Sequence, residues 1–380
     1  MNVAESDHAS YVSARDSTYK DLLIYSARKS GRSPLQIQRE FGRMARSHSR
    51  LNMVEYVRNG LYDINRFTLE ERDQFISNDL HWPIVHRCNK NSWVGAAEDK
   101  VVAATLLNAG GVPTPETIAV LDRSPRIYPA LRKIDSVETL SNVLRDNLDE
   151  PLFCKIVDGM VSFGAFRIER CDANQIVCAG HPPMSHEQFL SEFVGGNAYI
   201  IQRELRNHSR LSAYASALGT VRMVNMVTDS GVLCPIAVIK LPQGNNIADA
   251  FWRPGNLACE IDVETGRIRT VARRGVEMEF LDDHPDNPGL MGLELPFWSK
   301  LREVNERAAR IFSPIRYQST DIAITEDGPV IVELNYGGGF DLPQYASGRG
   351  MLTREVRDFF ESCGVTFDAK KKRGFFWGKS

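Results

Sequence analysis

The sequence predicts an α+β fold in which a helical N-terminal region precedes a larger unit built on a largely antiparallel sheet. Between about residues 19 and 77, apolar residues recur at helical spacing with charged residues between them. Beyond Trp93, short runs rich in β-branched and aromatic residues alternate with short helical segments, and glycine and proline separate them. The sequence contains no internal repeat or low-complexity stretch, so we do not expect a solenoid.

Composition and charge limit the classes of partner. The 380 residues are 43% hydrophobic, and 46 Lys and Arg nearly cancel 48 Asp and Glu, which leaves a formal charge of −2. Such a balance produces no long-range field toward nucleic acid or an acidic membrane, so we expect neither as a partner. The basic run at residues 370–373 is the exception, and a solvated chain end is favoured there over an interaction patch.

Cysteine usage and the N-terminal segment favour a reducing compartment. Seven cysteines are scattered without a C-x-x-C pair, and their number is odd, so neither a disulfide framework nor a zinc knuckle is indicated. The first residues contain no basic segment leading into an apolar core, and no apolar run is long enough to cross a bilayer. We therefore expect a cytoplasmic protein.

Local signals divide the chain into three predicted parts, residues 1–95, 96–205 and 206–380. Ser33-Pro34, and Thr68 followed by two glutamates, are helix-start signals in the first part. Further helices are predicted at residues 99–109, before Gly110-Gly111, and at residues 297–312. Strands are predicted at residues 152–157, 165–169, 199–205, 220–227, 237–241, 258–263, 267–271, 321–325 and 330–335.

The strands at residues 321–325 and 330–335 form the most informative predicted hairpin. A three-residue turn, Glu326-Asp327-Gly328, would place glycine where a left-handed residue is needed. Directly opposite residues of an antiparallel pair have Cβ atoms roughly 5 Å apart, so this hairpin brings two carboxylates together on one face. The register that follows sets Thr325 opposite Pro329, Ala323 opposite Ile331 and Asp321 opposite Glu333.

A divalent cation is the simplest reason for two carboxylates to meet. Because side chains alternate along a strand, Asn335 shares the face of Glu333 and adds an amide oxygen to the two acids. Ligation by oxygen alone favours magnesium or manganese over zinc, and Mg²⁺ on few protein carboxylates usually completes its shell with phosphate oxygens and water. The alternative, on spacing alone, is a solvated hairpin whose acids face water.

Several segments resemble motifs of the ATP-grasp superfamily and occur in its order. The Asp-x-x-x and Glu-x-Asn ends of the hairpin resemble its metal-binding signature, and the resemblance covers residues 99–344. Residues 98–115 resemble its first lysine segment, residues 153–164 its second lysine and phosphate-covering loop, and residues 201–205 its adenine hinge. Residues 205–208, 219–222, 250–255 and 261–266 resemble the branch named sugar-transfer-associated ATP-grasp proteins.

The resemblance implies an ATP-grasp fold, in which two α+β subdomains hold ATP, with ATP and Mg²⁺ or Mn²⁺ as cofactors. The phosphate loop and hinge would lie in residues 96–205, and the metal site in residues 206–380. Lys155 and Arg222 would be the catalytic cations, and Asp321, Glu333 and Asn335 the metal ligands. The implied nucleotide-binding residues are Lys100, Lys155, Gly159, Ser162, Gly164, Gln202, Glu204, Leu205, Asp321 and Glu333.

Arg222 is expected to bind an anion, and a further group of residues is expected to contact the substrate. A buried arginine on a strand needs an anion, which a γ-phosphate or an acyl phosphate would supply; the alternative is a salt bridge to one of the chain's acids. After Asn335 the chain has Tyr-Gly-Gly-Gly, whereas the family commonly has a proline there, so the acceptor loop departs from the family. The residues expected to contact substrate are Lys240, Trp252, Arg253, Gly338 and Asp341, and Asp249 lies in the same segment.

The resemblance implies a carboxylate–amine ligase. A carboxylate would attack the γ-phosphorus to give ADP and an acyl phosphate, which an amine would capture to form an amide, as in a biosynthetic pathway. We expect a small-molecule acid and amine as substrates; whether a carrier protein presents either one, and the oligomeric state, stay open. Two alternatives also stay open: an ATP-dependent phosphotransferase on the same fold, and a non-catalytic nucleotide-binding protein.

Overall fold

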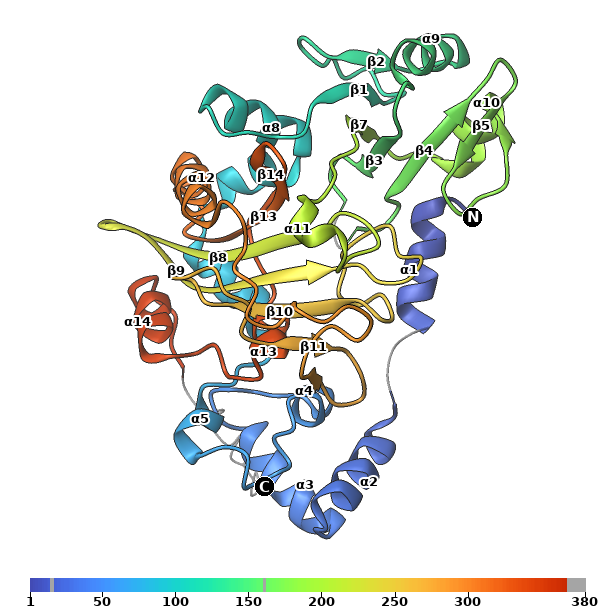
Figure 1. Ribbon diagram of the computed structural model, residues 1–380. Helices are drawn as coiled ribbons and strands as arrows, with labels where there is room; N and C mark the ends of the chain where they lie inside the picture. The colour runs from blue at the N-terminus through green and yellow to red at the C-terminus, as the bar shows by residue number, and fades with distance from the viewer. Residues whose placement is uncertain (14–16, 160–161, 368–380) are drawn as a thin grey trace, which may run out of the picture. The chain divides into compact units, whose positions relative to one another are not determined.

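The computed structural model describes residues 1–13, 17–159 and 162–367, and the chain divides into two compact units. The first unit comprises residues 1–15, 89–274 and 279–338, and the second comprises residues 16–88, 275–278 and 339–380. Both sheets belong to the first unit (Figure 1). The three-part division at residues 95 and 205 stays a prediction. The basic run at residues 370–373 lies outside the described residues.

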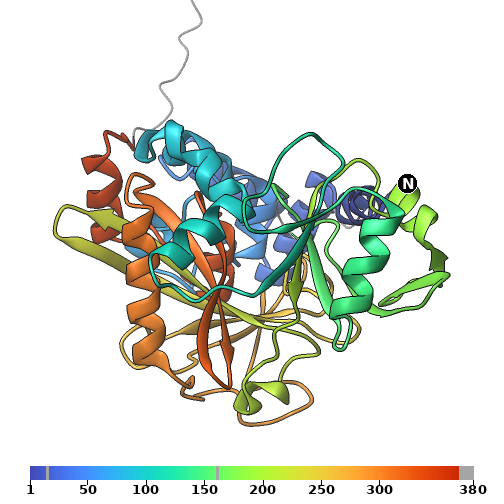
Figure 2. The same cartoon turned by 90° about the horizontal axis from the view of Figure 1, so that it is seen from above.

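The first sheet of this unit has seven strands in the order β2-β1-β7-β3-β4-β5-β6. Only β1 and β2 are parallel, and the other neighbouring strands pair antiparallel. Helix α9 (Val137–Asn147) packs against β1 and β2 (Figure 2). The strands are β1 (Thr117–Leu121), β2 (Arg132–Ile134), β3 (Leu152–Ile156), β4 (Phe166–Cys171), β5 (Gln175–Cys178), β6 (Met184–Ser185) and β7 (Tyr199–Arg203).

The second sheet of this unit also has seven strands, in the order β12-β11-β10-β9-β8-β13-β14, and all its neighbours pair antiparallel. Helix α12 (Trp298–Ile311) packs across β8, β9, β13 and β14 (Figure 2) and buries Leu301 and Ala308 there. The strands are β8 (Thr220–Thr228), β9 (Gly231–Leu241), β10 (Leu257–Ile261), β11 (Val271–Arg273), β12 (Glu279–Leu281), β13 (Tyr317–Thr325) and β14 (Gly328–Asn335).

Helix α8 (Lys100–Ala109) begins and ends where the sequence predicts. The side chain of Asp99 caps it by accepting hydrogen bonds from the backbone N–H groups of Val101 and Val102, both at 3.0 Å. It ends at Gly110, and Gly111 takes a left-handed conformation with φ of 70°. Because Lys100 is the first helical residue, its position is fixed by this cap. The other helices of this unit are α1 (Val3–Ser13), α7 (Val94–Glu98), α10 (His186–Gln188) and α11 (Ser209–Ser212), with short η2 (Asn91–Trp93) and η3 (Phe189–Phe193).

The second unit is helical in its described residues, and the predicted helix starts are confirmed. Ser33 caps α3 with Pro34 in first position, and Thr68 caps α5. No helix among the described residues is long and apolar enough to span a membrane. The helices are α2 (Tyr19–Ser30), α3 (Pro34–Met44), α4 (Met53–Arg58), α5 (Leu69–Asp73), α6 (His81–Cys88), α13 (Asp341–Ser347) and α14 (Arg354–Ser362), with short η1 (Asn78–Leu80).

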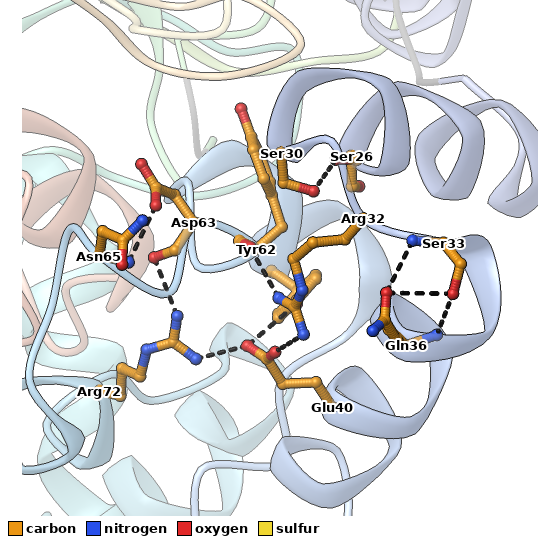
Figure 3. Close-up of polar contacts among 11 residues, drawn as sticks. Ser26, Ser30, Arg32, Ser33, Gln36, Glu40, Tyr62, Asp63, Asn65 and Arg72 are labelled. Carbon is orange, nitrogen blue, oxygen red and sulfur yellow. Dashed lines mark hydrogen bonds and ion pairs between the residues drawn. The ribbon is translucent and has the colours of Figure 1, made fainter.

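A buried ion cluster around Glu40 supports the second unit (Figure 3). Arg32 contacts one carboxylate oxygen of Glu40 at 2.5 Å, and Arg72 contacts the other. The hydroxyl group of Tyr56 also donates a hydrogen bond to this carboxylate at 3.3 Å. One carboxylate therefore pairs with two arginines, of which Arg72 is almost fully buried.

We expect Glu40→Ala to lower the free energy of unfolding by about 3–5 kcal/mol, because it leaves two cations without their buried counter-charge. Urea denaturation of the full chain, followed by circular dichroism, measures this change. The exposed Glu70 of the same unit is the control, and Glu70→Ala should cost less than about 1 kcal/mol. Equal effects of the two substitutions would contradict the role given to the cluster.

Candidate active site

The β13–β14 hairpin brings Asp321 opposite Glu333, as predicted, but its turn and its pairing between the turn and Asp321 differ from the prediction. The turn has two residues, Glu326 and Asp327, because Gly328 pairs with Thr325. The predicted pairs Thr325–Pro329 and Ala323–Ile331 are therefore wrong. A β-bulge between Asp321 and Ile322 restores the register, because β14 supplies the additional residue Val332 there. The observed pairs are Thr325–Gly328, Ile324–Pro329, Ala323–Val330, Ile322–Ile331 and Asp321–Glu333.

Asp321 is held by two cations from neighbouring strands. Arg222 of β8 lies directly opposite Asp321 and donates two hydrogen bonds to its carboxylate, from Nε at 2.8 Å and from Nη2 at 2.6 Å. Lys240 of β9 reaches the same carboxylate at 3.2 Å, and also Asp249 at 3.1 Å. The anion that Arg222 requires is thus Asp321 in this structure, which is the alternative that the sequence left open.

Two lysines meet β14 at Glu333, one from α8 and one from β3 of the first sheet. Lys100 of α8 contacts the Glu333 carboxylate at 3.1 Å and donates a hydrogen bond to the Gly159 carbonyl at 2.5 Å. Lys155 of β3 donates a hydrogen bond to the carbonyl of Val332 at 2.8 Å. That carbonyl belongs to the bulge residue, so the bulge serves both the carboxylate register and the lysine contact. The Glu333 side chain is 28% exposed, so this end of the cluster reaches solvent.

The charges of this cluster shift the pKa values of its members. Burial raises the pKa of Asp321, but Arg222 and Lys240 outweigh it and hold the pKa below the usual range. The pKa of Glu333 is also lowered, because Lys100 and Lys155 together outweigh the effect of burial. Burial lowers the pKa of Lys155 to about 8, although Glu333 acts in the opposite direction. Both carboxylates are therefore ionised at neutral pH, and the pKa of Lys155 lies about one unit above neutral pH.

Asn335 and Ser319 extend the same face with atoms that have no partner. The two residues lie directly opposite each other on β14 and β13, one step beyond the acidic pair along each strand face. The Nδ2 atom of Asn335 and the Oγ atom of Ser319 are buried and without a hydrogen-bond partner in the part of the chain described. A Cβ atom at Gly338 would lie 2.9 Å from Ser319 Oγ, so glycine permits the loop to approach there. Buried polar atoms without a partner mark a place suited to a ligand.

A small cavity joins the lysines to the predicted adenine hinge. Its volume is about 20 Å³, and its walls include Lys100, Lys155, Gln202 and Glu333. This is room for about one water molecule, so a nucleotide can enter only if the walls separate. Gln202 donates a hydrogen bond to the Thr117 hydroxyl at 3.4 Å. The other two predicted hinge residues follow Gln202 in the sequence. Glu204 forms a salt bridge with Arg167 at 3.3 Å, and Leu205 is half-buried.

The predicted glycine loop lies between β3 and β4, and its two ends have different partners. Gly159 accepts the hydrogen bond from Lys100. Ser162 and Gly164 both have positive φ, of 58° and 69°. The backbone N–H of Gly164 donates a hydrogen bond at 2.9 Å to Asp7, a residue that the sequence did not indicate.

The residues predicted to contact substrate do not all gather around the carboxylates. Lys240 does, and its partner Asp249 accepts a hydrogen bond from the hydroxyl of Thr220. Trp252 packs against Tyr11 of α1, with ring centroids 5.3 Å apart, and Arg253 contacts Asp7. Gly338 accepts a hydrogen bond from Tyr317 at 2.9 Å and lies beside Ser319. Asp341 belongs to the second unit.

The sequence of this chain matches a known protein family. Residues 83–358 match the family described as sugar-transfer associated ATP-grasp, which is more than half of the chain. The chain belongs to this family. Its two sheets and N-terminal helices therefore constitute an ATP-grasp fold, as predicted. No curated protein matches the chain.

Solved structures similar to this ATP-grasp chain include three enzymes of low identity. The VanG D-Ala:D-Ser ligase from Enterococcus faecalis is 12% identical over 71% of this chain and 62% of that chain, with a TM-score of 0.39. The D-alanine–D-alanine ligase from Bacillus anthracis is 15% identical over 71% and 67%, with a TM-score of 0.38. Biotin carboxylase from Campylobacter jejuni is 10% identical over 72% and 47%, with a TM-score of 0.39. The chain thus spans less than two thirds of the first of these, and likenesses at this level say nothing of its substrates.

The donor set of this ATP-grasp protein fits a hard divalent cation. Among the described residues, no group of three or more His, Cys, Asp and Glu side chains is placed to hold a metal ion. Asp321 and Glu333 supply two carboxylates, and the Asn335 amide, turned by 180°, would present an oxygen where its Nδ2 atom has no partner. Oxygen donors of this kind match magnesium or manganese.

Proposed function

We propose that this ATP-grasp protein joins a carboxylate to an amine, with ATP and Mg²⁺ as cofactors. One observation supports this most: the second sheet sets Asp321 opposite Glu333, and cations of both sheets surround the two acids. Family membership supports ATP as the nucleotide. The reaction would form an acyl phosphate and ADP, and attack by the amine would then release phosphate and leave an amide.

The proposed chemistry requires an exchange of ion pairs. In this structure the cluster is internally neutralised, because Arg222 and Lys240 hold Asp321, and Lys100 holds Glu333. Phosphate oxygens are stronger anionic ligands for these cations than a single carboxylate each, since they carry more charge. Entry of a nucleotide would therefore transfer the cations to phosphate and free both carboxylates.

The freed groups would then have defined tasks. Asp321, Glu333 and Asn335 would hold magnesium, which supplies charge neutralisation at the phosphates when it is bound. Lys155 would orient the phosphate chain from β3, and Arg222 would stabilise charge that develops as the γ-phosphoryl group moves to the substrate carboxylate. Among the described residues of the site, we assign none as the base that would remove a proton from the amine.

A phosphate-release assay tests this function. The purified chain is incubated with ATP and Mg²⁺ and with small carboxylates and amines, first singly and then in pairs. We expect phosphate release only with a matched acid and amine, and none from Glu333→Ala. A Glu333→Ala variant as active as the wild type would refute the site.

Two other outcomes separate the remaining alternatives. Transfer of phosphate to one substrate without an amine would indicate a phosphotransferase on the same fold. Binding of ATP without turnover across a broad panel would indicate a non-catalytic nucleotide-binding protein.

A further inference from the structure

Helix α1 places a carboxylate on the phosphate-covering loop, and neither the proposed reaction nor the family match explains it. Asp7 Oδ2 accepts the hydrogen bond from Gly164 N–H at 2.9 Å and contacts the Arg253 guanidinium at 3.3 Å. Both side chains are mostly buried, with 19% of Asp7 and 16% of Arg253 exposed. One carboxylate oxygen thus binds two donors that come from segments far apart in the chain.

The two donors that Asp7 accepts from are of types that commonly bind phosphate in proteins. A backbone N–H in a glycine loop and a guanidinium are common ligands of phosphate oxygens. The Nε–H of Arg253 is also buried and has no partner among the described residues, so the guanidinium retains a donor for a further anion. The other end of the same loop, Gly159, is bound by Lys100 of the proposed nucleotide site.

Aromatic contacts keep Asp7 in this position. Tyr11, one helical turn after Asp7, packs edge-on against Phe163 of the loop and Trp252, with ring centroids 5.5 and 5.3 Å apart. Phe163 and Trp252 also contact each other at 5.7 Å, and the Arg253 guanidinium lies 4.8 Å above Trp252. Helix α1, the loop at Phe163 and the segment around Trp252 therefore pack against one another. A Cβ atom at Gly164 would lie 2.9 Å from Ala4, so the helix meets the loop backbone directly.

We propose that Gly164 N–H and Arg253 form an oxyanion subsite for the terminal phosphate of the nucleotide, and that Asp7 is its built-in occupant. The proposal rests on the nucleotide site proposed above. Asp7 and the phosphate compete for the same donors, so the nucleotide must displace Asp7 to bind there. Helix α1 then acts as an internal competitor that weakens binding of the triphosphate.

Titration calorimetry with Mg²⁺ and a non-hydrolysable ATP analogue tests the competition in the full chain. We expect Asp7→Asn to tighten binding of the analogue by about fivefold, the upper range of what a partly exposed ion pair contributes. ADP, which lacks the terminal phosphate, should bind both proteins equally. Glu5→Gln removes an exposed carboxylate from the same helix and should change neither affinity.

A double-mutant cycle identifies the donor. In an Arg253→Gln background the effect of Asp7→Asn should fall below about twofold, because one of the contested donors is then absent. Unchanged or weaker binding of the analogue by Asp7→Asn would overturn the subsite, as would an equal gain for ADP. Failure of the wild type and of Asp7→Asn alike to bind the analogue would instead refute the proposed nucleotide site.

Discussion

Replacing Asp321 by asparagine is expected to lower ATP turnover by about a thousandfold. The substitution keeps the size of the side chain but removes the charge that pairs with Arg222 and Lys240. In the proposed reaction it also removes one of two carboxylates that would hold magnesium. The loss should appear in kcat rather than in KM, because the charge acts on the phosphoryl group in transfer. Coupled ADP-release kinetics with a matched acid and amine measure both constants.

Controls for this prediction come from the same hairpin. Asp327 lies exposed at the turn, and Asp327→Asn should leave turnover within about twofold of the wild type. Because Asp321→Asn removes the carboxylate that Arg222 binds and leaves Lys240 with Asp249 alone, its thermal unfolding must be compared with that of the wild type. Glu333→Gln is the second variant, since the Glu333 side chain is partly exposed and perturbs folding less. Normal turnover in both folded variants would contradict the site.

The hairpin illustrates what strand patterns can predict. Alternation along residues 321–335 brings Asp321 and Glu333 to one face, and the structure confirms that pairing. The three-residue turn was wrong, and the error was cancelled by a bulge at Val332. A bulge leaves no mark in hydrophobic alternation when the residue is a half-buried valine, so only backbone pairing reveals it.

The counter-charge of the two carboxylates comes from the protein itself. Two opposed carboxylates do require a counter-charge, but the protein supplies it with its own Arg222, Lys240 and Lys100. Lys240 lies 81 residues before Asp321, and Lys100 lies 233 residues before Glu333, so no local spacing indicates which cation meets which acid. A nucleotide-free protein of this kind should bind Mg²⁺ weakly, since both carboxylates are already paired.

Contacts of the N-terminal segment could not be predicted. The sequence predicts one helical region over residues 1–95, yet α1 packs on the glycine loop of the first unit at Gly164. Asp7 and Gly164 are 157 residues apart, and an acidic residue in a short helix gives no signal of such a partner. Ser319 did have a signal, because it lies two residues before Asp321 and thus on the same strand face.

Lys155→Met is expected to lower kcat/KM for ATP by about a hundredfold or more, because the buried ammonium is proposed to hold the phosphate chain. The wild type should also show a pH dependence with a defined sign. Burial lowers the pKa of Lys155 to about 8, so the charged form is complete below that pH and is lost above it. Between pH 7 and pH 9, kcat/KM should therefore fall by about tenfold.

The variant also tests the assignment of this titration. Lys155→Met has no ammonium to lose, so its residual activity should not fall between pH 7 and pH 9 through this group. Lys300, an exposed lysine on α12, is the matched control, and Lys300→Met should keep both the rate and the pH profile of the wild type. A fall of the same size in Lys155→Met would assign the titration to another residue. Lys155 would then still help to position the phosphate chain, but loss of its charge would not cause the fall in activity.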